Sequence, residues 1–229
     1  MDDALATRDD QGGRDVRARR AYRLWHSRVS YRHEGMLVTD LGHFLDLPDD
    51  VPGPARRLAE QLSLIVRAAT AVDPGFAWVS ALPCRRRPGR RACPGHVGVC
   101  RTDVPASIEW WCTSCDDAGM ISGWERSPFD LRPRNPECDA TDPALVTIPA
   151  EVAATLRSLR LLDSASERIV FRACATERGI VLAADEDDLD ELAGFIAAET
   201  NHEPDRGRQK RLDVAFAVLN DAIARLDDA

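Results

Sequence analysis

The chain has 229 residues and 44% of them are hydrophobic, so it is long enough to bury a core in one large domain or two small ones. Its formal net charge of −8 argues against a general binder of nucleic acid or anionic membranes, because a polyanionic surface would repel it. The sequence has no apolar run of the roughly 20 residues that a membrane span needs and no signal-peptide segment, so we predict a cytoplasmic protein whose thiols stay reduced.

Residues 1–35 are polar and arginine-rich, which predicts a disordered leader. The sequence becomes more apolar from Met36 onward, and we hypothesise that translation starts at this residue. An intact-mass measurement of protein made from the native gene tests that hypothesis. Lys210 is the single lysine among 30 basic residues, a usage typical of GC-rich bacterial genomes.

A helix followed by short strands is expected in a first domain over residues 36–131. Residues 51–72 repeat apolar side chains at spacings of three and four, which predicts an amphipathic helix. The apolar run at 76–82 is typical of a buried strand. Three further strands are expected between proline and glycine breakers, at 96–101, 107–112 and 118–124.

A proline-rich linker at 132–143 separates this domain from an acidic module at 144–229. Residues 139–229 carry 19 acidic and 10 basic side chains, a net charge of −9. The expected elements of the module are a strand at 145–148, a helix at 149–161, a hairpin of 169–175 with 180–184, and a helix at 187–200. A polar loop, NHEPDRG, then leads to a last helix, whose apolar side chains recur from Leu212 to Leu226 at spacings of three and four. The final helices are expected to pair antiparallel, and the predicted fold class is α+β.

Two polar features of the module receive structural interpretations. The acidic run that begins at Asp185 is interpreted as the cap of the helix at 187–200 rather than as a cation site. Glu199-x2-His202 matches half of a di-iron carboxylate motif, but the last helix lacks the second half.

Four of the seven cysteines form two pairs, Cys84-x8-Cys93 and Cys112-x2-Cys115, with 18 residues between the pairs. Turn-forming residues follow each pair, so both turns can point their sulfurs at one ion. Zinc prefers four tetrahedral thiolate or imidazole ligands. We therefore predict one structural Zn²⁺ bound by these four cysteines.

The segment that carries the cysteines, at about residues 83–131, resembles a zinc ribbon, in which strands arrive at and leave two metal-binding turns. Its first cysteine pair departs from that pattern, because the two residues are eight apart rather than two. The runs ALPCRRRPGRRACPG and IEWWCTSCDDAGMISGWERSPFDL also resemble bacterial proteins to which no activity is assigned. The resemblance therefore implies a zinc-stabilised fold and no reaction.

The cysteine cluster has three other interpretations. Cys93-x2-His96 is also a ligand pair, so His96 is the alternative to Cys84 as the fourth ligand. The four cysteines can instead be buried thiols without a metal. Trp111-Cys112-x2-Cys115 matches a thioredoxin-like redox pattern, but that chemistry needs a helix after the first cysteine, and the residues that follow do not predict one.

Five arginines fill the interval between the first two cysteines: Arg85, Arg86, Arg87, Arg90 and Arg91. One interpretation is that they offset the net charge of about −2 on a zinc ion with four thiolates. The other is contact with phosphate or an acidic partner, with Trp110, Trp111 and Trp124 nearby for stacking.

The leading functional hypothesis is a non-enzymatic binding or adaptor protein with a structural zinc site and an unknown protein partner. The first alternative is a nucleic-acid-binding regulator that uses the Arg85–Arg91 loop. The second alternative is a thiol redox or zinc enzyme at Cys112 and Cys115. The sequence contains no P-loop, G-x-S-x-G or H-E-x-x-H motif, and four available cysteines indicate a closed site, whereas a catalytic zinc needs an open coordination position.

Overall fold

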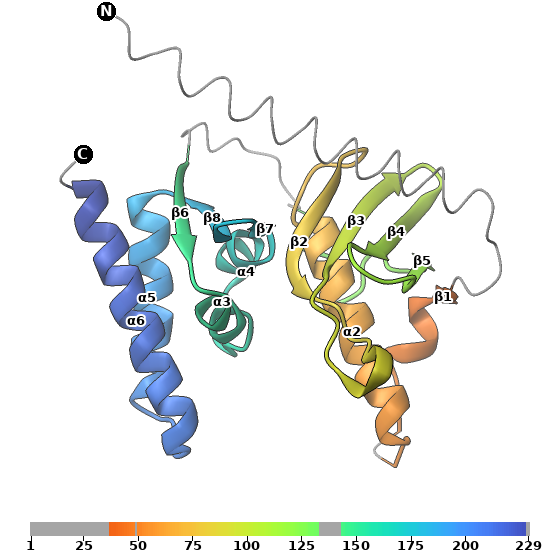
Figure 1. Cartoon of the computed structure of the whole chain (residues 1–229), viewed down its shortest axis with the longest axis horizontal. Helices are drawn as coiled ribbons and strands as arrows, with labels where there is room; N and C mark the ends of the chain where they lie inside the picture. The colour runs from red at the N-terminus through yellow and green to blue at the C-terminus, as the bar shows by residue number, and fades with distance from the viewer. Residues whose placement is uncertain (1–36, 49, 133–142, 228–229) are drawn as a thin grey trace, which may run out of the picture. The chain divides into compact units, whose positions relative to one another are not determined.

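The computed structural model describes residues 37–48, 50–132 and 143–227 (Figure 1). The predicted leader at 1–35 and most of the predicted linker at 132–143 lie outside the described residues. Within them the chain is a mixed α+β protein, as predicted, with five α-helices and eight strands. None of the described helices has the length and apolar composition that crossing a bilayer requires.

The chain divides into two compact units. Unit 1 ends at Phe129, and unit 2 begins at Asp130 and also contains residues 70–72. Each unit has its own paired strands and its own buried apolar side chains, so each is described by itself.

The sheet of unit 1 is an antiparallel meander of β2 (Ala77–Pro83), β3 (His96–Asp103), β4 (Ala106–Cys112) and β5 (Ala118–Ser122). These strands confirm the four that the sequence predicts in this region, with ends that differ by one or two residues. The short strand β1 (Leu37–Asp40), which the sequence did not predict, pairs parallel to β5 at the edge.

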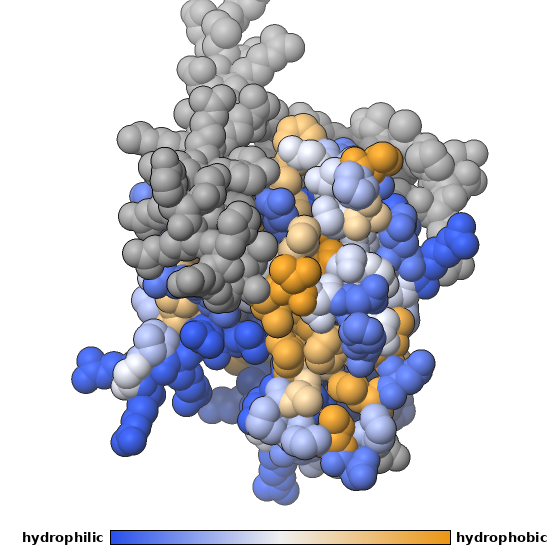
Figure 2. Space-filling model, turned by 90° about the vertical axis from the view of Figure 1, so that its right-hand side faces the viewer, coloured by the Kyte–Doolittle hydropathy of each residue, from blue (hydrophilic) through white to orange (hydrophobic). Residues whose placement is uncertain are grey.

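The edge at β1 leaves apolar side chains in contact with solvent. Val38 of β1 is 62% exposed, and Leu45 beyond it is 38% exposed. Figure 2 views the side on which β1 lies and shows apolar residues running down that face between polar ones. Leu41, directly after β1, is nonetheless completely buried, so this edge contributes both to the core of the unit and to its apolar surface.

The helix α2 (Gly53–Thr70) confirms the predicted helix at 51–72 and buries Leu62, Ile65 and Val66 completely. Arg101 of β3 donates from Nη1 to the carbonyl of Ala69 at 3.3 Å, near the carboxyl end of this helix. A cation is favourable at that end because the helix dipole is negative there. Alternation along β3 places Val97 and Val99 on the same face as Arg101.

Gly98 lets β3 and β4 pack closely. A Cβ atom at Gly98 would lie 2.2 Å from the indole of Trp111, its cross-strand partner. The ring of Trp111 therefore lies across the backbone of β3, and its side chain is almost fully buried. This contact joins the two strands that carry the cysteine loops.

The sheet of unit 2 has β8 (Gly179–Ala184) at its centre, with β6 (Ala144–Ile148) and β7 (Cys174–Thr176) antiparallel on either side. The predicted strands at 145–148 and 180–184 are confirmed. The helix α3 (Ala150–Arg157) confirms the predicted helix at 149–161 but ends four residues earlier, at the C-cap Ser158.

The predicted strand at 169–175 is wrong. Residues Ser164–Phe171 form the helix α4, and only the three residues of β7 are extended. Asp163 caps α4, because its Oδ1 accepts the backbone N–H of Ser166 at 2.7 Å. The apolar run at 169–171 is buried at the end of this helix, and a run that short does not distinguish a strand from a buried helical turn.

The last two helices, α5 (Glu186–Thr200) and α6 (Arg206–Asp227), lie side by side and antiparallel, as predicted (Figure 1). Asp185 caps α5 in a capping box with Asp188, which confirms the structural interpretation of the acidic run.

Glu199 joins three parts of unit 2. Its carboxylate accepts the backbone N–H groups of Arg160 and Leu161 and forms an ion pair with Arg208 of α6. The carboxylate is thus fully engaged in holding the end of α5, which explains its buried position without a metal.

Candidate metal centre

The four predicted ligand cysteines come from two loops of unit 1. Cys84 follows β2 directly and Cys93 precedes β3, whereas Cys112 ends β4 and Cys115 lies in the turn before β5. Because β3 and β4 are paired, with Val97 opposite Cys112, both loops leave the sheet at the same end. The sheet therefore brings together thiols that are up to 31 residues apart.

The sulfur atoms have the spacing of a coordination site. Cys84 Sγ lies 3.7 Å from Cys115 Sγ, and Cys93 Sγ lies 3.6 Å from Cys112 Sγ. All four sulfurs lie within 4.8 Å of one another. A disulfide bond would be about 2.05 Å long, whereas a zinc tetrahedron with bonds of about 2.3 Å has edges of about 3.8 Å. The distances match shared coordination and not disulfides.

Three of the four sulfurs accept a backbone N–H from the residue two positions later in the chain. These contacts are Arg86 N to Cys84 Sγ at 3.4 Å, Gly95 N to Cys93 Sγ at 3.4 Å and Ser114 N to Cys112 Sγ at 3.3 Å. A donated N–H stabilises a thiolate more than a thiol, because it favours the charged form. Both loops are therefore shaped to hold ionised sulfur.

Gly95 lets the two cysteine loops touch. A Cβ atom at this position would lie 2.5 Å from Cys112 Sγ and 2.9 Å from the backbone nitrogen of Ser114. The carbonyl of Gly95 accepts the N–H of Cys84 at 2.8 Å, which closes the first loop on itself. Any larger residue at 95 would push the loops apart and open the cysteine cluster.

Burial and backbone contacts shift the thiol pKa values in opposite directions. Burial raises the pKa of Cys112 from 9.0 to about 11 and also raises the pKa of Cys84. The N–H of Gly95 lowers the pKa of Cys93. Without a cation, the site therefore has both protonated and more acidic thiols, and a metal ion would have to displace protons from Cys84 and Cys112.

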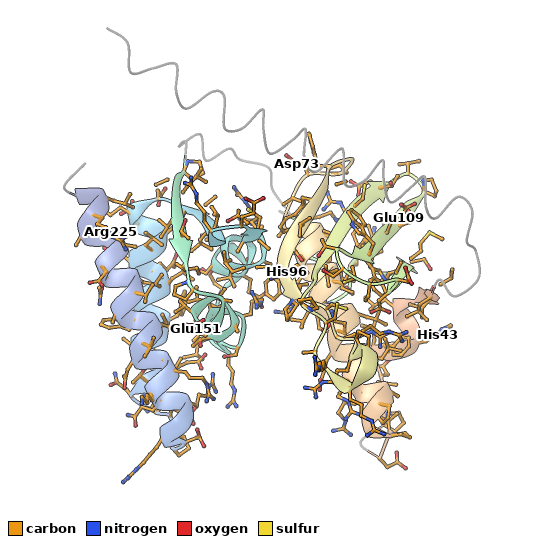
Figure 3. All side chains as sticks on the ribbon, in the orientation of Figure 1. His43, Asp73, His96, Glu109, Glu151 and Arg225 are labelled. Atoms are coloured by element: carbon orange, nitrogen blue, oxygen red, sulfur yellow. The ribbon has the colours of Figure 1, made fainter. Side chains whose placement is uncertain are left out.

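Among the described residues, the one group of histidine, cysteine or carboxylate side chains close enough to share an ion contains the four cysteines. His96 does not belong to this group of side chains. It begins β3 (Figure 3), and its backbone N–H donates to Thr113 Oγ1 at 2.9 Å. The choice of Cys84 over His96 as a ligand stays a prediction, but the geometry agrees with it.

The surroundings of Cys112 differ from those of a thioredoxin-like redox site. Cys112 ends a strand, and the next element is the strand β5 rather than a helix. The helix dipole that lowers the pKa of a redox-active cysteine is therefore missing at this position, and burial raises the pKa of Cys112 instead.

Asp117 forms ion pairs with two of the five arginines in the loop between Cys84 and Cys93. Its carboxylate lies 3.5 Å from Arg85 Nε and 3.8 Å from Arg86 Nε, and its side chain is only 9% exposed. Its carbonyl also accepts the N–H of Cys112 at 2.8 Å. Sequence reasoning missed this residue, although an aspartate two positions after Cys115, facing an arginine-rich loop, was an available signal.

A groove with a volume of about 610 Å³ lies beside the centre. Arg57 of α2 and three loop arginines line it, together with Cys115, Asp116 and Asp117. All five loop arginines are exposed, but Arg90 and Arg91 do not line the groove. The three candidate stacking residues, Trp110, Trp111 and Trp124, are at most 3% exposed, so the expectation that they stack on a ligand is wrong.

No protein family, curated protein or solved structure matches the chain.

Proposed function

We propose that Cys84, Cys93, Cys112 and Cys115 bind one Zn²⁺ as thiolates in a zinc-ribbon-like arrangement, and that the protein is a non-enzymatic binding or adaptor protein. The observation that carries this proposal is the spacing of the four sulfurs, at 3.6–3.7 Å for the two closest pairs. Four ionised sulfurs at that spacing would repel one another, and a cation between them would remove that repulsion.

Zinc is the ion that suits this donor set best. Four thiolates in a tetrahedron are typical of structural zinc, and iron is the main competitor for the same geometry. An iron centre would colour the protein, whereas zinc has no visible absorption because its d shell is full.

A structural role follows from the closed shape of the site. Four protein ligands leave no coordination position for water or substrate, which a catalytic zinc requires. Asp117, the nearby carboxylate, already forms ion pairs with Arg85 and Arg86. The metal would therefore stabilise the conformation of the two loops, and the exposed surfaces of those loops would bind the partner.

The test is the metal content of the native chain, purified without metal-affinity steps and measured by mass spectrometry. We expect one zinc per chain, released by a mercurial that blocks thiols. Cys84→Ser should lose the zinc. Cys100→Ser should keep it, since Cys100 is buried in β3 outside the cluster.

Three results would contradict the proposal. The first is a chain that purifies and folds without metal. The second is loss of zinc from His96→Ala with retention in Cys84→Ser, which would replace the fourth ligand. The third is a Cys112–Cys115 pair that titrates reversibly with a redox buffer in the wild type, which would favour the redox alternative.

A further inference from the structure

The groove beside the metal centre concentrates positive charge on a small surface. Arg57 comes from the first turns of α2, and Arg85, Arg86 and Arg87 come from the loop that follows Cys84. Two segments almost 30 residues apart in the sequence thus contribute guanidinium groups to the lining of one groove of about 610 Å³.

Four guanidiniums and two carboxylates line the groove, the carboxylates being those of Asp116 and Asp117, so the cations are in excess. Asp117 contacts Arg85 and Arg86, so one carboxylate serves two guanidiniums. Arg57 and Arg87 form no ion pair with any residue that the structure describes. Exposed guanidiniums at the rim of a groove are available to an anion from solution.

Asp117 also orients the arginines that it contacts. It is nearly buried and is fixed by its own backbone bond to Cys112, so Arg85 and Arg86 are held at the wall of the groove. Arg57 folds back along its helix, since a Cβ atom on Gly53 would lie 3.1 Å from Arg57 Nη1. Arg85 is the more restrained of the two arginines at Asp117, since its side chain is 33% exposed and that of Arg86 is 61% exposed.

We propose that this groove binds the phosphate group of a small phosphorylated molecule. Arginine forms paired hydrogen bonds to phosphate oxygens, and a doubly charged phosphate needs more than one cation. A volume of 610 Å³ lies within the range of about 300–1,000 Å³ that is typical of small-molecule sites.

Two observations favour a small ligand over a nucleic acid. Trp110, Trp111 and Trp124 are buried, and none of the described residues that line the groove is aromatic, so bases would have no ring there to stack on. The net charge of −8 on the whole chain opposes a long polyanion more than a single phosphate.

The shape of the groove rests on the proposed metal centre, because Cys84 and Cys93 anchor both ends of the arginine loop and Cys115 lines the groove. Metal content is therefore measured on every sample used for binding. A chain without metal would contradict the proposed function, whereas a metal-loaded chain that does not bind phosphate would contradict only the groove proposal.

The experiment is calorimetric titration of the full metal-loaded chain with orthophosphate, pyrophosphate, adenosine diphosphate, a short single-stranded oligonucleotide and a glutamate peptide. The first three distinguish free phosphate from a nucleotide. We expect at least one of these three to bind with a Kd below about 1 mM. The metal content is measured again afterwards, to exclude extraction of the ion by pyrophosphate.

The test variant is Arg57→Ser with Arg87→Ser, and the matched control is Arg90→Ser with Arg91→Ser, which removes the same charge from outside the groove. The test variant should lose about tenfold or more in phosphate affinity, as expected for lost hydrogen bonds to a charged group, whereas the control should change less than about twofold. Both should keep the metal.

Equal losses in the two variants would overturn the proposal, because they would show only a diffuse attraction. Tighter binding of the oligonucleotide or the glutamate peptide than of all three phosphate compounds would also overturn it, in favour of a nucleic acid or an acidic protein. Failure of the metal-loaded wild type to bind any phosphate compound would end it.

Discussion

The two units of the chain close their loops by different means. In unit 2 the connections are short. The carboxylates of Asp163 and Asp185 accept backbone N–H groups at the starts of α4 and α5, and that of Glu199 accepts N–H groups in the loop after α3. In unit 1 the loop after β2 has exposed residues from Arg85 to Ala92, with no buried apolar side chain to anchor it. The comparison teaches that a loop without apolar anchors needs another cross-link, and a metal ion shared by the four cysteines is the one that we propose.

The two units can be followed separately in solution. All four described tryptophans, Trp78, Trp110, Trp111 and Trp124, belong to unit 1, and residues 130–229 contain none. Four of the five described α-helices, α3 to α6, belong to unit 2. Tryptophan fluorescence therefore reports mainly on unit 1, and the helical circular dichroism signal reports mainly on unit 2.

The largest expected effect is loss of a cysteine ligand. Cys112→Ser should destabilise unit 1 by several kcal/mol or more, since structural zinc contributes on the order of 10 kcal/mol in zinc-finger peptides. The fluorescence transition on heating should move down or disappear, while most of the circular dichroism transition stays. An unchanged fluorescence transition on heating would contradict the comparison between the two units, because unit 1 would then be stable without the proposed cross-link.

A core truncation in unit 2 should give the opposite pattern. Leu192 of α5 is completely buried, so Leu192→Ala should cost about 3 kcal/mol through lost burial and a cavity. Chemical denaturation followed by circular dichroism should show the loss, with little change in fluorescence. Leu161→Ala is the control, because Leu161 is 53% exposed. Similar costs for both variants would argue against the described core.

Metal affinity should depend steeply on pH. The raised pKa values of Cys84 and Cys112 mean that both thiols carry protons at neutral pH in the metal-free chain. Displacement of at least these two protons predicts that zinc affinity rises by at least about a hundredfold per pH unit. Competition with a chromophoric chelator between mildly acidic and mildly alkaline pH measures this slope. A flat profile would show that the thiols are not the ligands.

A smaller effect is expected at the polar junction of unit 2. Glu199→Gln removes the charge that Arg208 contacts and should cost about 2 kcal/mol, because a buried charged hydrogen bond is weakened. Glu191→Gln, at an exposed position of the same helix, should change stability by less than about 0.5 kcal/mol. Denaturant midpoints by circular dichroism compare the two. Equal midpoints would assign Glu199 no special role.

The parts of the fold that local pattern defines were predictable. The periodic apolar face of α2, the strands around the cysteine turns and the cap at Asp185 all follow from short-range spacing. The helix α4 was missed because its apolar run is only three residues long, although Asp163 was a readable cap. The strand β1 was missed because its pairing with β5 joins residues about 80 positions apart.

The candidate site was also predictable only in part from the sequence. Cysteine spacing and turn residues indicate a shared ion, and the structure places those four sulfurs together. The contact of Asp117 with Arg85 and Arg86, and the arrival of Arg57 at the same groove, depend on the tertiary arrangement of α2 and two loops. No local pattern specifies that arrangement, so the groove became visible only in three dimensions.

X-ray absorption at the zinc edge tests the central claim most directly, since it measures the ligands of the bound ion in the native chain. The account predicts a first shell of four sulfurs at about 2.3 Å. A shell that contains a nitrogen, which would bring in a histidine such as His96, or a purified chain with no zinc to measure, would contradict it.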